Sequence, residues 1–362
     1  MTITEKSDAD RFRQYLLKLK KELWLGASRS WWPDYLFHHT NLSNVVEILK
    51  LEHLYSRSEL KSRGESFADS ASSEVIKQTS EKWKDSVRFY FRPQTPTFYN
   101  VEGLRPKDRQ KFGVQCPMPV YLLFDFENII CHRDSRFSNG NLAASDAHIS
   151  STSSEFEKLP FQRIYHVGSI PEEQKRAIVF HRNAEVIVPK EVGLEHLKRI
   201  WCRSEAERDT LRHLLGESLW DIWKDKITNR SDHSLFFRQW IYVDTVEMSA
   251  STIRFRLNPC HSLEDAGPYD IRVEIRETKT GAKYLDVKNQ CLLTWNQQRF
   301  DTEFSNPLGK KKWNEIETKP GNTLSYSLRN LAQPDDYSVQ LFVDDQLVFA
   351  SRYVEEIEDI PF

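Results

Sequence analysis

The sequence lacks the features of disulfide-stapled, zinc-binding and membrane-spanning proteins. Its five cysteines are widely spaced and form no C-x-x-C pair, which argues against a disulfide framework and against a zinc site. No apolar run approaches the roughly 20 residues that a membrane helix needs. The opening residues Met1 to Lys6 have no apolar core like that of a signal peptide. We therefore expect a protein of the reducing cytoplasm, with no bound metal and no membrane partner.

An excess of charge of either sign is also missing. The 51 Lys and Arg residues against 53 Asp and Glu residues give a formal net charge of -2, so global charge gives no sign of a nucleic-acid binder. Any such binding must rest on local basic clusters. Aromatic residues are plentiful, at 12% with 10 Trp, which is enough for a packed core. A length of 362 residues predicts two domains.

The first part of the chain predicts an α+β domain. Apolar segments predict strands over residues 35–38, 87–91, 120–126 and 185–189, and the segment 120–126 is apolar almost throughout, which is typical of a central strand. Helices are predicted over residues 9–25, after a cap at Asn41 or Ser43, and after the capping box Ser204–Glu207. Residues 132–160 are polar and rich in serine, and we expect a loop there.

The pattern changes after about residue 235. Apolar residues alternate with polar ones around residues 253–257, 271–275 and 337–343, and Asp344-Asp345 is typical of a hairpin turn. About seven short strands predict an all-β sandwich, of which the immunoglobulin type is one form. The predicted domains are therefore residues 1–220, a junction over 221–235, and a β-sandwich accessory domain over 236–362.

Three segments carry residue types suited to one chemistry. Glu185 is a lone carboxylate on an apolar strand, His38 ends an apolar stretch, and Tyr90 lies in an aromatic strand. Cleavage of a nicotinamide–ribose bond needs a carboxylate to stabilise an oxocarbenium-like sugar and an aromatic surface for nicotinamide. Each residue also has a structural interpretation: a strand-edge Glu facing water, a structural histidine, and an aromatic core strand. None of the three decides the matter alone.

Four blocks in register resemble the DarT family of DNA ADP-ribosyltransferases. The family's F-H-x-T opening, Y-F-x-P-x-(S/T)-P block, F-(S/T)-(D/N)-G segment and A-E-(F/V)-L-V strand are matched by Phe37–Val45, Phe89–Thr97, Phe137–Asn141 and Asn183–Val188. Together the blocks span roughly residues 35–215, and the C-terminal third is not covered. The resemblance implies an α+β ADP-ribosyltransferase-like fold, a split antiparallel sheet with helices, followed by the all-β sandwich.

The resemblance also implies roles for individual residues. Glu185 would be catalytic, stabilising the oxocarbenium and orienting or deprotonating the attacking base nitrogen. The residues implied in NAD binding are His38, Thr40, Asn44, Tyr90, Thr95 and Arg92. The loop residues Arg133, Arg136 and Phe137 could contact a single DNA strand through phosphates and stacking. NAD would be consumed as a substrate.

Two departures from the family pattern bear on function. Many members carry an I-K-x-R-R run with an arginine that touches NAD phosphate, whereas this chain has Val75–Thr79 without arginine. Arg57 or Arg92 are the two candidates to replace it. The block Arg92–Thr97 differs from the P-R-S-P-M form of the thymidine-modifying branch, which favours guanine over thymine as the acceptor.

The sequence thus predicts an NAD-dependent ADP-ribosyltransferase that modifies a base in single-stranded DNA. The family implies a bacterial toxin or anti-phage effector, paired with an antitoxin that hydrolyses ADP-ribosyl-DNA. One alternative is an ADP-ribosyltransferase acting on RNA or protein. A second is a catalytically inactive module that binds NAD or nucleic acid. Consumption of NAD separates the inactive module from the other two.

Overall fold

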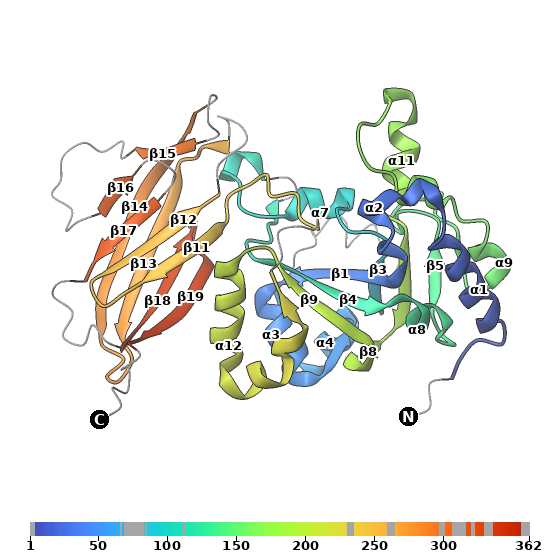
Figure 1. The fold of residues 1–362 in the computed structure, drawn as a ribbon, viewed down its shortest axis with the longest axis horizontal. Coiled ribbons are helices and arrows are strands. Elements are labelled where there is room, and N and C mark those ends of the chain that lie inside the picture. Colours follow the sequence, from blue (N-terminus) through green and yellow to red (C-terminus); the bar gives the residue numbers. More distant parts are fainter. Residues whose placement is uncertain are drawn as a thin grey trace.

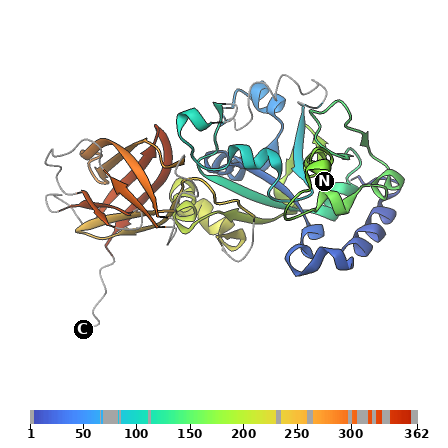
Figure 2. The same ribbon diagram turned by 90° about the horizontal axis from the view of Figure 1, so that it is seen from above.

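The protein is built from two parts that lie end to end, with α12 (Glu205–Trp223) between them (Figure 1). The computed structural model describes residues 4–65, 67–68, 83, 85–110, 113–229, 235–258, 265–296, 301–305, 316–319, 323–328 and 336–355. The elongated outline is clear in the perpendicular view as well (Figure 2). Each part has its own hydrophobic cluster. Within the described ranges, no helix combines the length and apolarity needed to cross a membrane.

The N-terminal part is organised around one large sheet. Its strands run in the spatial order β10 (Ile227–Thr228), β9 (Leu197–Cys202), β4 (Pro119–Asp125), β1 (Tyr35–Asn41), β3 (Ser86–Tyr90), β7 (Glu185–Pro189), β5 (Arg136–Ser138) and β6 (Ile149–Ser150). All neighbouring pairs are antiparallel except β9 and β10. The predicted central strand is confirmed: β4 lies between β9 and β1 and is buried along nearly its whole length.

The large sheet is almost divided between β1 and β3. These two strands share the single register pair Phe37↔Tyr90, whereas β1 pairs with β4 along its whole length. The two halves, β10-β9-β4-β1 and β3-β7-β5-β6, therefore diverge beside His38, as expected of a split antiparallel sheet.

Helices and short strands surround the two halves of the sheet. They are α1 (Ala9–Leu19), α2 (Gly26–Arg29), α3 (Leu42–Leu51), α4 (Arg57–Arg63), α7 (Pro96–Val101), α8 (Phe126–Cys131), α9 (Ser153–Phe156), α10 (Phe161–Ile164) and α11 (Lys175–His181), with a separate two-stranded sheet of β2 (His53–Tyr55) and β8 (Glu191–Gly193). Asn41 is the cap of α3, because its side chain accepts a hydrogen bond from the Ser43 amide at 3.0 Å.

Two sequence predictions in this part were wrong in extent. The helix predicted over residues 9–25 ends at Leu19, because Leu19 and Leu25 are both buried and, six residues apart, would point in different directions on one continuous helix. The loop predicted over 132–160 contains β5, β6 and α9. These elements are too short for hydrophobic periodicity to reveal them.

The C-terminal part is formed by two antiparallel sheets. One has the order β11 (Val243–Met248), β12 (Thr252–Leu257), β17 (Thr323–Ser327), β16 (Ile316–Lys319), and the other β15 (Asp301–Ser305), β14 (Lys283–Asn296), β13 (Tyr269–Glu277), β18 (Asp336–Val343), β19 (Gln346–Val354). The alternating residues predicted for β12, β13 and β18 are buried in one cluster. Asp344 and Asp345 have φ of 49° and 63° and form the tight turn predicted between β18 and β19.

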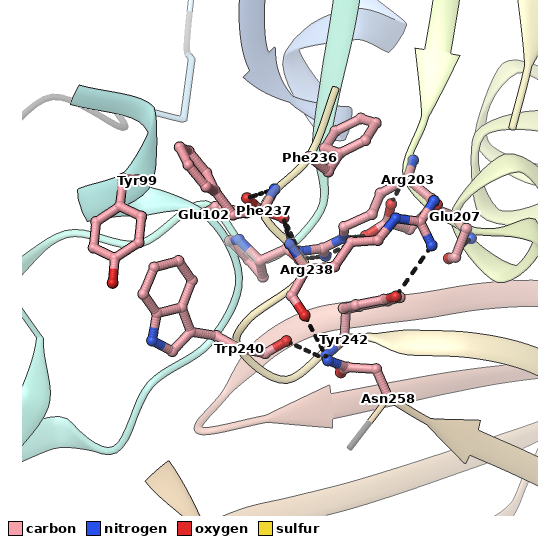
Figure 3. Close-up of polar contacts among 12 residues, drawn as sticks. Tyr99, Glu102, Arg203, Glu207, Phe236, Phe237, Arg238, Trp240, Tyr242 and Asn258 are labelled. Atoms are coloured by element: carbon pink, nitrogen blue, oxygen red, sulfur yellow. Dashed lines mark hydrogen bonds and ion pairs between the residues drawn. The ribbon is translucent and has the colours of Figure 1, made fainter. Parts of the chain in front are cut away.

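A buried polar joint connects the two parts (Figure 3). The carboxylate of Glu102 accepts hydrogen bonds from the amides of Phe237 at 2.7 Å and Arg238 at 3.0 Å. Arg203 is fully buried, donates to Glu207 and lies 3.6 Å from Glu102. Burial acts to lower the pKa of Arg203, but the carboxylates of Glu207 and Glu102 outweigh it and the pKa is raised. Arg203 is therefore held as a cation between two carboxylates.

The strap of residues 235–242 crosses this joint from one part to the other. The Asn258 side chain donates to the Trp240 carbonyl at 2.8 Å and accepts from the Tyr242 amide at 2.7 Å. Gly103 has a φ of 69°, and a Cβ there would lie 3.1 Å from Trp240 Cβ, so glycine is favoured at this crossing. Because β10 belongs to the large sheet, the chain crosses near the C-terminal end of the junction predicted at 221–235.

Candidate active site at the split of the sheet

His38 lies at the split and is bonded across it. Its Nδ1 is 2.9 Å from the Arg88 carbonyl oxygen, and since a carbonyl can only accept, Nδ1 carries the hydrogen. Burial lowers the pKa of His38, with the bond to Arg88 opposing it. The ring is therefore neutral near pH 7. Its Nε2 can accept a hydrogen bond from a sugar hydroxyl.

Thr40 and Asn44 form a hydrogen-bonded pair beside His38. Thr40 follows His38 by two residues on β1, so both side chains leave the strand on the same side. Asn44, in the first turn of α3, donates to Thr40 Oγ1 at 2.8 Å, and it is bonded in both directions to the backbone of Ala68. The pair thus places polar atoms and a short loop segment next to His38.

Tyr90 and Glu185 are directly opposite each other on β3 and β7, so both side chains lie on one face of the sheet. Burial raises the pKa of Tyr90, and Glu185 adds to the rise, which keeps the phenol protonated. His39 stacks parallel to Tyr90 at 5.5 Å, and burial lowers the pKa of His39 to about 3. A neutral ring thus supports the aromatic surface beside the carboxylate.

Glu185 is the buried carboxylate of the site. It is 2% exposed, and among the described residues its Oε2 has no hydrogen-bond partner. Arg88 Nη1 lies 3.6 Å from that oxygen. Burial raises the pKa of Glu185, against the opposing effects of Arg88 and the Leu142 amide. A buried oxygen with unused hydrogen-bonding capacity is suited to receive a group from a ligand.

The segment after β5 is packed closely against the site. The Glu185 amide donates to Ser138 Oγ at 3.0 Å, and Asn141 donates to the Phe180 carbonyl at 3.1 Å. A Cβ on Gly140 would lie only 2.3 Å from the Phe180 ring, so this position requires glycine unless the segment moves. Helix α11, which carries Phe180, therefore fixes the segment that approaches Glu185.

Arg92 and Thr95, both predicted to bind NAD, are used by the fold. Arg92 is 2% exposed and donates to the backbone carbonyls of Pro93, Ile164 and His166. Thr95 is fully buried and caps α7 by accepting from the Phe98 amide at 3.1 Å. Neither side chain offers its polar atoms to a ligand in this conformation.

The three predicted DNA contacts fall in different environments. Phe137 is 2% exposed and packs against Phe12 and Phe156 in the core, so it is not placed to stack on a base. Arg133 and Arg136 are exposed. Arg136 lies opposite Ile187, which in turn lies opposite Arg88 on the Glu185 face of the sheet. Of the three residues, Arg136 therefore lies in the cross-strand row that contains Ile187 and Arg88, beside Glu185.

Two residues were suggested to replace the arginine that this chain lacks in the family's basic run. Residues 75–79 lie outside the described residues. Of the two suggested replacements, Arg92 is occupied as above, and Arg57 lies on α4 with its guanidinium 5.6 Å from the Phe67 ring.

Arg88, like His39, is a site residue that the sequence interpretation missed. It is half-buried and contacts both His38, through its carbonyl, and Glu185, through its guanidinium. The period of two along Val87–Tyr90 could have found it, because Arg88 must share a face with Tyr90. Among the described residues there is no group of three or more His, Cys, Asp or Glu side chains that could hold a metal ion.

Comparison with known proteins places this chain in an established class, the ADP-ribosyltransferases. Residues 37–237 match the family model described as DarT, ssDNA thymidine ADP-ribosyltransferase. That match covers more than half of the chain and extends beyond the range of the sequence blocks. The chain therefore belongs to the DarT family. A search of curated proteins found no match.

Three solved structures are similar to the chain at low identity. Thermus sp. 2.9 DarT in complex with ADP-ribosylated ssDNA is 16% identical with a TM-score of 0.43, covering 55% of this chain and 95% of that one. The same protein in complex with NAD+ is 17% identical with a TM-score of 0.41, covering 55% and 93%. Thermosipho africanus DarTG in complex with ADP-ribose is 18% identical with a TM-score of 0.41, covering 60% and 53%. The family model, and not these overlays, carries the assignment.

Proposed function

We propose that the protein transfers ADP-ribose from NAD to a base in single-stranded DNA. The observation that carries the proposal is the buried Glu185 carboxylate at the split, with one oxygen unbonded in the described structure and an aromatic residue, Tyr90, opposite. Family membership supports the reaction, and the solved Thermus relatives in complex with NAD+ and with ADP-ribosylated ssDNA support donor and acceptor.

The donor half of the reaction needs groups for the nicotinamide ribose. In the proposed complex His38 Nε2 accepts a hydrogen bond from a ribose hydroxyl, the Thr40 hydroxyl, held by Asn44, binds beside it, and Tyr90 supports the nicotinamide ring. The C1′–nitrogen bond breaks and its electron pair leaves with nicotinamide, which becomes neutral. Glu185 stabilises the oxocarbenium-like sugar that remains.

The acceptor half completes the transfer. A base nitrogen donates its lone pair to C1′, and the proton it loses passes to the Glu185 carboxylate and then to water. A raised pKa suits Glu185 to this step, because a general base works best with a pKa near the operating pH. Arg136, exposed and in line with the site, is the proposed phosphate contact, and Arg133 is a weaker one.

The acceptor base is proposed to be guanine, although the family model is described by thymidine. The support is the Arg92–Thr97 block, whose turn differs in sequence from the thymidine-modifying form. In the structure Gln94 has a φ of 52° and its side chain donates to the Phe236 carbonyl at 2.9 Å, so this turn is tied to the strap. A cytoplasmic toxin with an antitoxin hydrolase is the proposed setting, which the Thermosipho DarTG relative favours.

The experiment is NAD turnover with single-stranded oligonucleotides of differing base content, read by intact mass, beside Glu185→Ala. The expected result is an oligonucleotide heavier by one ADP-ribose, formed with guanine-containing strands and absent with the variant. Transfer of ADP-ribose to RNA or protein, with none to DNA, would show that DNA is not the acceptor. A folded protein that consumes no NAD with any acceptor would point to an inactive binding module.

A further inference from the structure

Arg88 reaches Glu185 diagonally across the pair of strands. In the β3–β7 register Arg88 lies opposite Ile187, and Glu185 lies two residues before Ile187 on β7. Diagonal neighbours in an antiparallel pair are about 7–8 Å apart at the backbone, within reach of a long side chain. The guanidinium arrives at 3.6 Å from Glu185 Oε2, which is ion-pair distance without a hydrogen bond.

This geometry leaves an oxygen of the Glu185 carboxylate able to accept a hydrogen bond from a ligand. A bidentate pair would occupy both oxygens of Glu185 and direct them to the arginine. Here Oε2 has no hydrogen-bond partner in the described structure, although the cation is near enough to act on its charge. The Arg88 side chain is also 27% exposed, so it reaches solvent although the carboxylate beside it is buried.

The same residue fixes His38. The Arg88 carbonyl accepts the Nδ1 hydrogen of His38, which sets the ring's tautomer. Because that contact uses the backbone, a substitution of the Arg88 side chain leaves it in place. The effect of the guanidinium on Glu185 can therefore be tested apart from the orientation of His38.

We propose that Arg88 is a positioning residue that keeps Glu185 ionised and directed at the substrate. This inference rests on the proposed function of Glu185 in ADP-ribosyl transfer. Without the guanidinium, the pKa of a carboxyl group buried to this degree would rise further, and its protonated form could neither stabilise the sugar cation nor accept the proton of the base. Arg88 in this way supplies a cation at the site in a chain that lacks the arginine of the family's basic run.

Other groups that face Glu185 do not replace this charge. On β3 the opposite residue is the protonated phenol of Tyr90, and from the segment after β5 the contact is the Leu142 amide. On β1, His39 stacks on Tyr90 and His38 is bonded to the Arg88 carbonyl, and burial lowers the pKa of each, so neither ring supplies a cation. Arg88 is the cation that acts on Glu185 within the described part of the chain.

The test is the pH dependence of kcat for Arg88→Gln and Arg88→Lys with the full-length chain. Loss of the positive charge raises the pKa of Glu185 further, so Arg88→Gln should move the acid limb of kcat about one unit or more toward higher pH. On the acid side of the limb its kcat should fall about tenfold, and at pH 7 it should fall less, with the KM for NAD changed less than kcat. Arg88→Lys should keep the acid limb near that of the wild type.

The matched control is Arg254→Gln, which removes an arginine on β12 that lies directly opposite Glu247 on β11 and pairs with it at 3.4 Å. It should leave the acid limb unmoved. If Arg88→Gln also leaves the acid limb unmoved while lowering kcat, the positioning role is overturned and Arg88 contacts substrate or serves the fold.

A second readout separates this inference from the proposed function. The protonation of Glu185 is followed by infrared difference spectra against Glu185→Gln, in wild type and in Arg88→Gln. The inference expects the Glu185 carboxyl band to persist to higher pH in Arg88→Gln, whether or not NAD is turned over. Identical titrations overturn it. Absence of turnover in the wild type counts against the proposed function alone.

Discussion

The joint and the split both bury glutamate against arginine, but they satisfy the carboxylates differently. At the joint, both oxygens of Glu102 and both of Glu207 accept hydrogen bonds. Among the residues that the structure describes, Nη1 of Arg203 has no hydrogen-bond partner and lies 3.6 Å from Glu102. At the split, Oε2 of Glu185 accepts no hydrogen bond within the described residues, and its arginine approaches without bonding.

This difference separates a group that stabilises the fold from one reserved for chemistry. A buried carboxylate whose oxygens are all bonded recovers part of its desolvation cost through its partners, although burial still raises the pKa of Glu102 and of Glu207. A buried carboxylate with an oxygen that accepts no hydrogen bond destabilises the folded protein until a ligand donates to that oxygen. Such a loss of stability in exchange for activity is common at functional sites. The same residue type therefore predicts opposite effects of substitution at the two places.

The largest expected effect is on transfer by Glu185→Gln. Removing the carboxylate at the split should lower the turnover of NAD with DNA by about 10²–10⁴-fold, since both the cation and the base proton lose their partner. Steady-state kinetics with the oligonucleotide substrate measure this. Glu207→Gln at the joint is the matched comparison: per folded molecule, it should retain most of the turnover.

The next effect is on stability, through Arg203→Met. This change leaves two carboxylates buried without their cation, and we expect a loss of about 3–5 kcal/mol of unfolding free energy. Denaturant unfolding followed by tryptophan fluorescence measures it. A loss no greater than that of Arg254→Met, which removes an exposed ion pair worth at most about 1 kcal/mol, would contradict the structural account of the joint.

Gly140→Ala tests how closely the split is packed. The added methyl overlaps the Phe180 ring, so either the ring or the segment must move, at about 1–3 kcal/mol. Because that segment carries the Leu142 amide toward Glu185, we also expect a lower kcat. Phe180→Leu in the same chain should restore part of both. Unchanged melting and turnover in Gly140→Ala would show that the segment adapts freely.

The smallest expected effect is a gain in stability of Glu185→Gln. Its sign tests the comparison between the split and the joint most sharply. The folded-state pKa of Glu185 is raised above its ordinary 4.5, so the folded protein binds this proton more tightly than the unfolded chain does. Ionisation therefore costs stability as the pH rises through and above 4.5. Glu185→Gln removes that cost, and we expect it to be more stable by up to about 1 kcal/mol near pH 7.

The gain should vanish below about pH 4, where the carboxyl is protonated in both states. At neutral pH, Glu102→Gln should lower the unfolding free energy by about 1–3 kcal/mol. The reason is that an amide nitrogen cannot accept a hydrogen bond from the Phe237 or Arg238 amide. Thermal melting of both variants at the two pH values provides the comparison. Two shifts of the same sign would remove the distinction drawn between the sites.

The sequence predicted those elements whose hydrophobic pattern is long or strong. The strands around Leu122, Val186, Phe255 and Val339 were found because their apolar residues are continuous or alternate over several positions. Short elements such as β5 and β6 were missed because two or three residues carry no period. The helix over residues 9–25 was predicted too long because Leu23 and Trp24 continue the helical spacing of the apolar residues before them. In the structure Leu23 is 95% exposed.

The joint could not be predicted, because its members are distant in the chain. Glu102 and Arg203 meet only in the folded protein. The Ser204–Glu207 pattern was interpreted as a capping box, and half of it forms: the Glu207 amide donates to Ser204 Oγ at 3.2 Å. The Glu207 side chain instead accepts from Arg203. Motif polar residues such as Thr95 and Arg92 were likewise assigned to the ligand because the sequence does not show which polar atoms the backbone uses.

The strap also decides where this chain can be cut. The family match ends at residue 237, and a fragment stopping there would end at the first of the two amides that hold Glu102. It would also lose the Val243 carbonyl that accepts from Ser204, and the Ala350 amide that donates to Thr210. A recombinant catalytic fragment chosen by homology alone would thus lose the hydrogen bonds that Ser204 and, on α12, Thr210 make with the C-terminal part. The two C-terminal sheets thus complete hydrogen bonds of the N-terminal part at Ser204 and at Thr210 of α12.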